Sequence, residues 1–159
     1  RCKRVYALQK KGYTIKMIQE ILENEQKDKS TRKILIVDDD VKFCEILKKI
    51  FKKNNYFFEI ACDGWEAGKK AAEFHPIILI LNINLPGING LQVCEKLRSD
   101  PKTKNIKIIT ISGDLRYSEG DVLQAGANSF LTKPVNIDNL VSLCNYFVKN
   151  QTLKPNPDF

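Results

Sequence analysis

The sequence has no long apolar run and only one histidine. No stretch of about 18 apolar residues occurs, so the sequence predicts no membrane-spanning helix. The first residues are basic rather than apolar, and a signal peptide is therefore not indicated either. Because the chain starts at Arg1 and not at methionine, we expect it to be a fragment or a processed form. The single histidine, His75, has no second histidine or cysteine nearby, so we interpret it as a surface residue rather than a metal ligand.

Cysteine motifs are missing as well. The five cysteines are odd in number and include no CxxC pair and no Cys/His spacing typical of zinc sites. Four of them lie within apolar patterns, where a free cysteine behaves as a small hydrophobic residue: Cys44, Cys62, Cys94 and Cys144. These observations favour a reducing compartment, and we expect the protein to be cytoplasmic.

The positive charge of the chain is concentrated near its start. The net charge is +7. Residues 1–33 contain ten Lys/Arg and four Asp/Glu, a balance of +6, whereas the other 126 residues contain sixteen and fifteen, a balance of +1. A local basic segment suits a polyanionic partner such as DNA, although solvated basic helices are the commoner case.

From Lys33 onward, short apolar runs alternate with helix-like segments. "KILIV" at residues 33–37 is typical of a buried parallel strand, and an apolar face at helical spacing follows at Phe43, Ile46, Leu47 and Ile50. Further strands are expected at 56–62, 77–82, 106–112 and 129–132, and further helices at 65–74, 90–98, 117–125 and 137–149. Five such units predict an α/β domain, a parallel sheet with helices on both faces. Functional residues are then expected at the carboxyl ends of the strands.

Polar residues follow four of the predicted strands. The first strand ends in Asp38–Asp40, the third in Asn82 with Asn84 close by, the fourth in Ser112, and the fifth leads into Lys133. Clustered oxygen ligands suit Mg²⁺, and a hydroxyl and an ammonium group can hold a phosphoryl group. Each motif alone has a simpler interpretation, such as a helix cap or a turn. Their meeting at one edge of a sheet predicts a site.

These motifs resemble those of response regulator receiver domains. The matching segments are "ILIVDDD", "LNINLPGING", "TISG", "AGANSFLTKP" and the closing helix. The resemblance spans residues 33–150 and implies a five-stranded, doubly wound parallel sheet with a flavodoxin-like topology. It also implies a role in two-component phosphorelay signalling, with a sensor histidine kinase or another signalling protein as partner.

The resemblance implies a magnesium site next to a substituted phosphate acceptor. Asp38 and Asp39 would be the acidic pair that holds Mg²⁺, and the backbone carbonyl of Asn84 would be a further ligand. The family accepts phosphate on an aspartate at the end of the third strand, where this chain has Asn82. An amide nitrogen is not a carboxylate nucleophile, so the usual acyl phosphate is not expected. The lost negative charge is expected to weaken Mg²⁺ binding.

Three other residues receive roles from the resemblance. Ser112 and Lys133 would contact a phosphoryl group, and Phe130 would be the aromatic residue that moves with Ser112 on activation. The Lys133–Pro134 bond would be cis, which suits a proline in a tight turn.

The amide at position 82 has more than one explanation. Either the natural protein is a pseudo-receiver, or a native aspartate has been replaced to make a variant that cannot be phosphorylated. Retention of Asp38, Asp39, Ser112 and Lys133 favours a recent or engineered loss. A third explanation is purely structural, because asparagine suits turns.

The basic residues 1–24 have a helical pattern of their own. A short helix is expected before Gly12, and Thr14 is a predicted N-cap for a second helix. The apolar face of the second helix would comprise Ile15, Ile18, Ile21 and Leu22. "GYTIKMIQEIL" resembles the later helices of a MerR-type helix-turn-helix domain, with residues 25–32 as a charged linker. The alternative is a helical hairpin that mediates dimerisation or packs on the receiver, and a symmetric homodimer would cover its apolar face.

The resulting hypothesis is a DNA-binding transcription regulator that is not an enzyme and whose receiver cannot be phosphorylated with Asn82 in place. The alternative is a pseudo-receiver that serves as a protein-interaction module without DNA binding. With an aspartate at position 82, the domain would catalyse its own phosphorylation from a small donor and its own dephosphorylation. Residues 151–159 have two prolines and no apolar period, so a disordered tail is expected there.

Overall fold

The computed structural model describes residues 2–151, with the side chain of Cys2 excepted. The chain forms two compact units, Arg1–Thr31 and Arg32–Phe159. The tail predicted at residues 151–159 lies, beyond Gln151, outside the described residues. No helix within residues 2–151 is long and apolar enough to cross a membrane.

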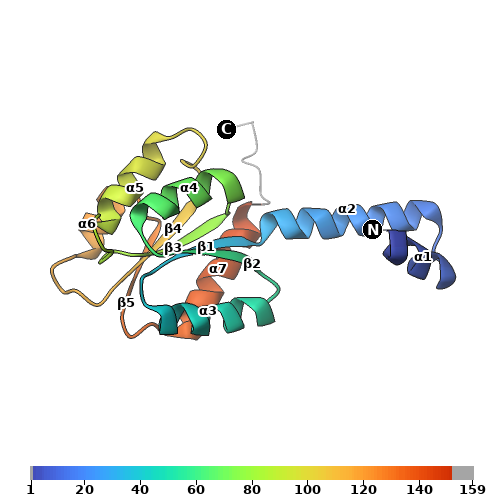
Figure 1. Ribbon diagram of the computed structural model, residues 1–159, viewed down its shortest axis with the longest axis horizontal. Coiled ribbons are helices and arrows are strands. Elements are labelled where there is room, and N and C mark those ends of the chain that lie inside the picture. The colour runs from blue at the N-terminus through green and yellow to red at the C-terminus, as the bar shows by residue number, and fades with distance from the viewer. Residues whose placement is uncertain (1, 152–159) are drawn as a thin grey trace. The chain divides into compact units, whose positions relative to one another are not determined.

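Strands and helices alternate through the second unit (Figure 1). In chain order they are β1 Lys33–Val37, α3 Val41–Lys53, β2 Phe57–Ala61, α4 Gly64–Phe74, β3 Ile78–Asn82, α5 Gly90–Ser99, β4 Lys107–Ser112, α6 Glu119–Gln124, β5 Ser129–Thr132 and α7 Ile137–Gln151. Every predicted strand and helix is present, with ends that differ by a few residues. The shortest helix, α6, starts later than predicted because Ser118 caps it and accepts a hydrogen bond from the backbone N–H of Asp121.

The sheet has the predicted topology. Its five strands are all parallel and lie in the order β2-β1-β3-β4-β5, which confirms the doubly wound, flavodoxin-like arrangement. The direction of winding reverses between β1 and β3, where Val37 pairs with Leu81. The residues that follow these two strands therefore lie next to each other at the carboxyl edge of the sheet.

Each face of the sheet is covered by its own helices. Helices α4, α5 and α6 cover one face, and α3 and α7 cover the other (Figure 1). Alternate residues of β1 serve the two cores: Leu35 and Val37 belong to the first, and Ile34 and Ile36 to the second. Since β1 is buried on both faces, its residues form a continuous apolar run.

The buried face of α3 differs from the predicted one. Cys44, Leu47 and Phe51 are buried, whereas Ile46 is 50% exposed. The buried residues follow the helical spacing i, i+3, i+7, which becomes visible only when cysteine is counted as apolar. The prediction that placed Ile46 on the buried face was therefore wrong.

The four cysteines with described side chains are free thiols, and three of them are buried. Burial raises the pKa of Cys44 to about 11 and the pKa values of Cys94 and Cys144 to about 12. These thiols therefore stay protonated and unreactive at neutral pH. Cys62 is exposed, contrary to its interpretation as part of the apolar pattern.

The first unit is a pair of helices, α1 Cys2–Lys10 and α2 Ile15–Thr31. Ile18 is buried within it, whereas Ile15, predicted on the same apolar face, is 68% exposed. The Thr14 hydroxyl accepts a hydrogen bond from the backbone N–H of Met17 (3.3 Å), as an N-cap does. Helix α2 continues to Thr31, so most of the segment predicted to be a charged linker is helical.

Candidate functional site

The predicted site residues meet at the carboxyl edge of the sheet. Asp38, Asn82 and Ser112, which end or follow β1, β3 and β4, are polar but only 3%, 7% and 1% exposed. Lys133 follows β5, and its side chain is 30% exposed. Polar groups buried this deeply require hydrogen-bond partners, and each of them has one.

The three consecutive aspartates have different positions. Asp40 is the N-cap of α3, where its side chain accepts hydrogen bonds from the backbone N–H groups of Lys42 and Phe43. Asp38 is buried and accepts from the backbone N–H of Asp40 through Oδ1 (2.9 Å). Asp39 is exposed, but its Oδ1 accepts a hydrogen bond from the amide of Asn82, the last residue of β3. Only Asp38 and Asp39 therefore contribute carboxylates to the site.

The Asn82 amide lies at the point where the acidic residues converge. Its Nδ2 is 3.2 Å from Asp38 Oδ1, 3.3 Å from Asp39 Oδ1 and 3.2 Å from the backbone oxygen of Asn84. Its Oδ1 accepts from the backbone N–H of Asn84 (3.3 Å). An amide has two N–H groups, so three acceptors share two donors. The amide therefore reduces repulsion between the carboxylates only in part.

The same oxygens form a ligand set that fits a divalent cation. Two carboxylate oxygens and one carbonyl oxygen face a single atom, and all-oxygen sites suit Mg²⁺. The Asn82 nitrogen faces these oxygens, so a cation would compete with this amide group. Within residues 2–151 no group of three or more His, Cys, Asp or Glu side chains is arranged to hold a metal. Asp38, Asp39 and the Asn84 carbonyl thus make a minimal set with little negative charge.

Lys133 supplies the positive charge of the site. Its Nζ is 3.1 Å from Asp38 Oδ2 and lies 5.1 Å from the centre of the Phe43 ring. The Lys133–Pro134 peptide bond is cis, and the Lys133 N–H donates to the backbone oxygen of Ser112 (2.9 Å). Asp38, Asp39 and Lys133 together carry a formal charge of −1. An ammonium group held beside an acidic pair can also bind phosphoryl oxygens.

Ser112 and Phe130 lie on neighbouring strands. The Ser112 Oγ accepts from the backbone N–H of Asp114 (3.0 Å), which ties it to the loop after β4. Phe130 is part of β5, pairs with Thr110 and packs half-buried against the core beneath α4, α5 and α6. Phe130 therefore belongs to the apolar core on that face of the sheet.

The loop after β3 contains contacts that the sequence did not indicate. Asn89 caps α5 and forms an isolated antiparallel β-bridge with Asn84. Its Nδ2 donates a hydrogen bond to the hydroxyl of Tyr117 (2.9 Å). Gly90 donates its N–H to the backbone oxygen of Ile83 (2.8 Å). The glycines and proline of "LPGING" signal a turn, but nothing in the sequence pointed to Tyr117 as its partner. These bonds hold the loop that carries the Asn84 carbonyl.

Comparison with known proteins identifies the domain to which this site belongs. Residues 34–145 match the family model described as the response regulator receiver domain. The curated relative Response regulator PleD of Caulobacter vibrioides is 36% identical over 104 residues, which cover 65% of this chain and 23% of that protein. The chain therefore spans about a quarter of the length of this relative.

Solved structures agree with this match. A response regulator signal receiver domain from Bermanella marisrubri is 31% identical, with a TM-score of 0.68 and coverage of 74% of this chain and 98% of that one. The signal receiver domain of a DNA binding response regulator protein (merR) from Colwellia psychrerythraea 34H is 26% identical, with the same TM-score and coverage.

Proposed function

Because the chain belongs to the response regulator receiver family, we propose that it is a two-component receiver that signals without accepting a phosphoryl group itself. Asn82 is the observation that carries the proposal. It ends β3 and offers an amide where the family resemblance requires a carboxylate nucleophile. An amide cannot form the acyl phosphate, so the domain acts as a binding module and not as an enzyme.

The neighbouring carboxylates do not replace the missing nucleophile. Asp38 is paired with Lys133 at 3.1 Å, and it also accepts hydrogen bonds from the Asp40 N–H and the Asn82 amide. Asp39 accepts from the same amide at 3.3 Å. Lone pairs engaged in this way are weak nucleophiles, and both residues extend from β1 and not from β3.

Asp38, Asp39 and the Asn84 carbonyl are the residues that would hold Mg²⁺. In a receiver with an acceptor carboxylate, the cation would neutralise charge on the transferring phosphoryl group. Here the set has one carboxylate fewer, so we propose that the cation is bound weakly. The amide nitrogen, already within hydrogen-bonding distance of all three oxygens, stabilises the acidic pair when no cation is bound.

Activation would then depend on a partner. Ser112 and Phe130 form the two-state element that the family resemblance suggests, and a partner that prefers one of its states would shift the equilibrium. A sensor histidine kinase or another signalling protein is the proposed partner. The free thiols of the described residues support a reducing, cytoplasmic setting for this role.

Phosphoryl uptake provides the direct test. After incubation with Mg²⁺ and acetyl phosphate, the chain as it stands is expected to keep its intact mass, because no acceptor carboxylate ends β3. Mass spectrometry measures this directly, and acid and alkaline quenching would distinguish an acyl phosphate from a stable phosphoester. A gain of one acid-stable or acyl phosphoryl group in the receiver would contradict the proposal.

The basic first unit supports DNA binding as the output. Residues 1–33 have a charge balance of +6, and "GYTIKMIQEIL" resembles the later helices of MerR-type DNA-binding domains. The Colwellia psychrerythraea relative is also described as a DNA binding response regulator protein. We propose that residues 1–24 are part of such a domain, that residues 25–32 connect it to the receiver at 33–150, and that homodimers form through it. The alternative is an interaction module that docks to a partner protein without contacting DNA.

Salt dependence separates the two alternatives. The full-length protein is expected to bind duplex DNA, and about four phosphate contacts would lower its affinity about a hundredfold between roughly 50 and 200 mM salt. Replacing Lys10, Lys11 and Lys16 by glutamine should make this dependence shallower. No DNA binding at low salt, together with capture of a signalling protein that is insensitive to salt, would favour the interaction module.

A further inference from the structure

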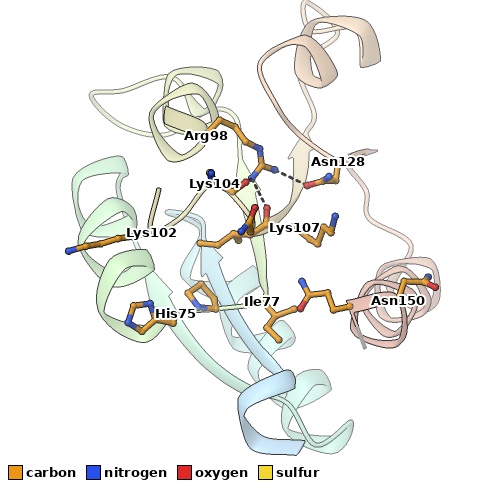
Figure 2. A pocket seen from close by; sticks show the side chains of 12 residues that line it. His75, Ile77, Arg98, Lys102, Lys104, Lys107, Asn128 and Asn150 are labelled. Atoms are coloured by element: carbon orange, nitrogen blue, oxygen red, sulfur yellow. Dashed lines mark hydrogen bonds between the residues drawn. The ribbon is translucent and has the colours of Figure 1, made fainter. Parts of the chain in front are cut away.

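A large cavity lies at the opposite edge of the sheet from the acidic site. It has a volume of about 870 Å³ and belongs entirely to the second unit. It is formed where β3, β4 and β5 begin, between the residues that follow α4 and α5 and the end of α7. In Figure 2, Arg98 and Lys104 lie on one side of the opening, and His75 and Ile77 lie on the other. We call this site the basic cavity.

The lining of the basic cavity is positively charged. Four of its side chains are cationic and none is acidic: Arg98, Lys102, Lys104 and Lys107. Within the described part of the chain, none of the three lysines forms an ion pair with a carboxylate. The acid nearest in sequence, Asp100, accepts from the backbone N–H of Lys102 and is not part of the lining. The cavity therefore concentrates positive charge that no carboxylate of residues 2–151 neutralises.

Arg98 has a structural reason to be there, but the lysines do not. Its guanidinium donates to the backbone oxygens of Gly126 (2.8 Å), Lys104 (2.8 Å) and Ile106 (2.7 Å), and to Asn128 Oδ1 (2.8 Å). It thus joins the end of α5 to the starts of β4 and β5, and a cation in the last turn of a helix is favourable in any case. Lys102, Lys104 and Lys107 follow the helix, and their side chains make no comparable bonds with residues 2–151. Their presence around a cavity has no equivalent structural explanation.

The remainder of the cavity has both polar and apolar side chains. Asn128 Oδ1 accepts from Arg98 and from the backbone N–H of Ile108 (2.9 Å), so its amide group is fixed with N–H donors left over. Pro76 and Ile106 are buried and supply apolar wall, with Ile77 partly buried beside them. Burial lowers the pKa of Arg98, so its charge is partly desolvated and acts strongly on a nearby anion.

We propose that the basic cavity binds a small phosphorylated molecule. Lysine ammonium groups form charge-assisted hydrogen bonds with phosphate oxygens, and Lys104 and Lys107 both line the cavity. The apolar wall of Ile77 and Ile106 accommodates the non-phosphate part. The volume is within the range of roughly 300–1,000 Å³ in which small-molecule sites occur, whereas a duplex would contact only the rim.

Titration calorimetry with pyrophosphate and with a nucleoside triphosphate tests this inference. The full 159-residue chain is used in EDTA, which removes any contribution from a cation at the acidic site. We expect dissociation constants below about 1 mM, and a loss of about tenfold or more when three lysines are replaced by glutamine. The replaced residues are Lys102, Lys104 and Lys107.

A charge-matched control separates a site from a general effect of net charge. It replaces three exposed lysines of α3, Lys49, Lys52 and Lys53, by glutamine, and it should change the affinity by less than about twofold. Circular dichroism establishes that both variants are folded. An equal loss of affinity for pyrophosphate and the nucleoside triphosphate in the two variants would overturn the proposal. The absence of binding at millimolar concentrations of either probe would overturn it as well. Binding of duplex DNA alone, without binding of either small phosphate, would also overturn it.

Discussion

Asn82→Asp is expected to take up one phosphoryl group from acetyl phosphate in the presence of Mg²⁺, whereas the unchanged chain takes up none. The substitution would place a carboxylate beside Asp38 and Asp39, at the end of β3, with Lys133 3.1 Å from Asp38. Those are the residues that the family resemblance requires for formation of an acyl phosphate. Intact mass spectrometry of the two proteins, treated side by side, measures the gain.

Two controls make this result specific to the site. Asn82→Ala removes the amide without adding a nucleophile and should gain no mass. Adding Lys133→Gln to Asn82→Asp removes the ammonium group that could hold the phosphoryl oxygens, and it should lower the extent of phosphorylation about tenfold or more. If neither Asn82→Asp nor the unchanged chain gains mass, more than the acceptor has been lost, and a natural pseudo-receiver is the better explanation.

The same substitution should strengthen cation binding. The formal charge of the site would change from −1 to −2, and the amide nitrogen that now faces the three oxygens would be gone. We expect the dissociation constant for Mg²⁺ to fall by about tenfold, measured by calorimetry at fixed ionic strength. Asp39→Asn in the unchanged chain gives the opposite direction, because it removes one of the two carboxylates. An affinity that does not respond to either change would show that the cation binds elsewhere.

Gly90→Ala is expected to lower the free energy of unfolding by about 2 kcal/mol or more. A Cβ at position 90 would lie 2.6 Å from Cα of Ile83 and 2.8 Å from the backbone oxygen of Asn82. Both contacts are with backbone, which cannot move aside cheaply. Alanine is the better helix former by about 1 kcal/mol, but this gain is smaller than the cost of the overlap. Urea unfolding of the variant and the parent protein gives the difference.

Gly68→Ala is the matched control. Gly68 lies within α4, and a Cβ there would meet nothing within 4 Å. The same chemical change should therefore raise the free energy of unfolding by about 0.5–1 kcal/mol. Equal effects at positions 68 and 90 would show that the close approach of α5 to the end of β3 does not constrain the fold. The Gly90 variant should also bind Mg²⁺ more weakly, because the overlap is with the backbone of Asn82 and Ile83, next to Asn84, whose carbonyl is a proposed ligand.

Periodicity and local chemistry determined most of the architecture. Apolar runs rich in β-branched residues marked the five strands, and the alternation with helices required a parallel sheet. The carboxyl ends of parallel strands lie at one edge, so the sequence pattern alone places Asp38, Asn82, Ser112 and Lys133 together. These inferences succeed because strand direction and side-chain alternation depend only on the backbone, which is the same in every protein.

Other features depended on neighbours that are distant in sequence. The hydrogen bonds between the Asn82 amide and the carboxylates of Asp38 and Asp39 could not be predicted from the sequence, because the partners follow different strands. The same is true of the bond between Asn89 and Tyr117, which are 28 residues apart. Ile46 was misplaced because a rotation of α3 by part of a turn decides which of its apolar residues faces the sheet.

By itself, the sequence determined the fold class, the edge of the sheet that carries the acidic site, and the amide at the end of the third strand. Only the tertiary structure decided that the amide nitrogen lies between two carboxylates and a carbonyl, and that four cationic residues from α5, the following turn and β4 line one cavity. The physical reason is that hydrogen bonds and charge interactions act over a few ångströms of space. Residue type and local pattern say which groups are available, but packing decides which of them meet.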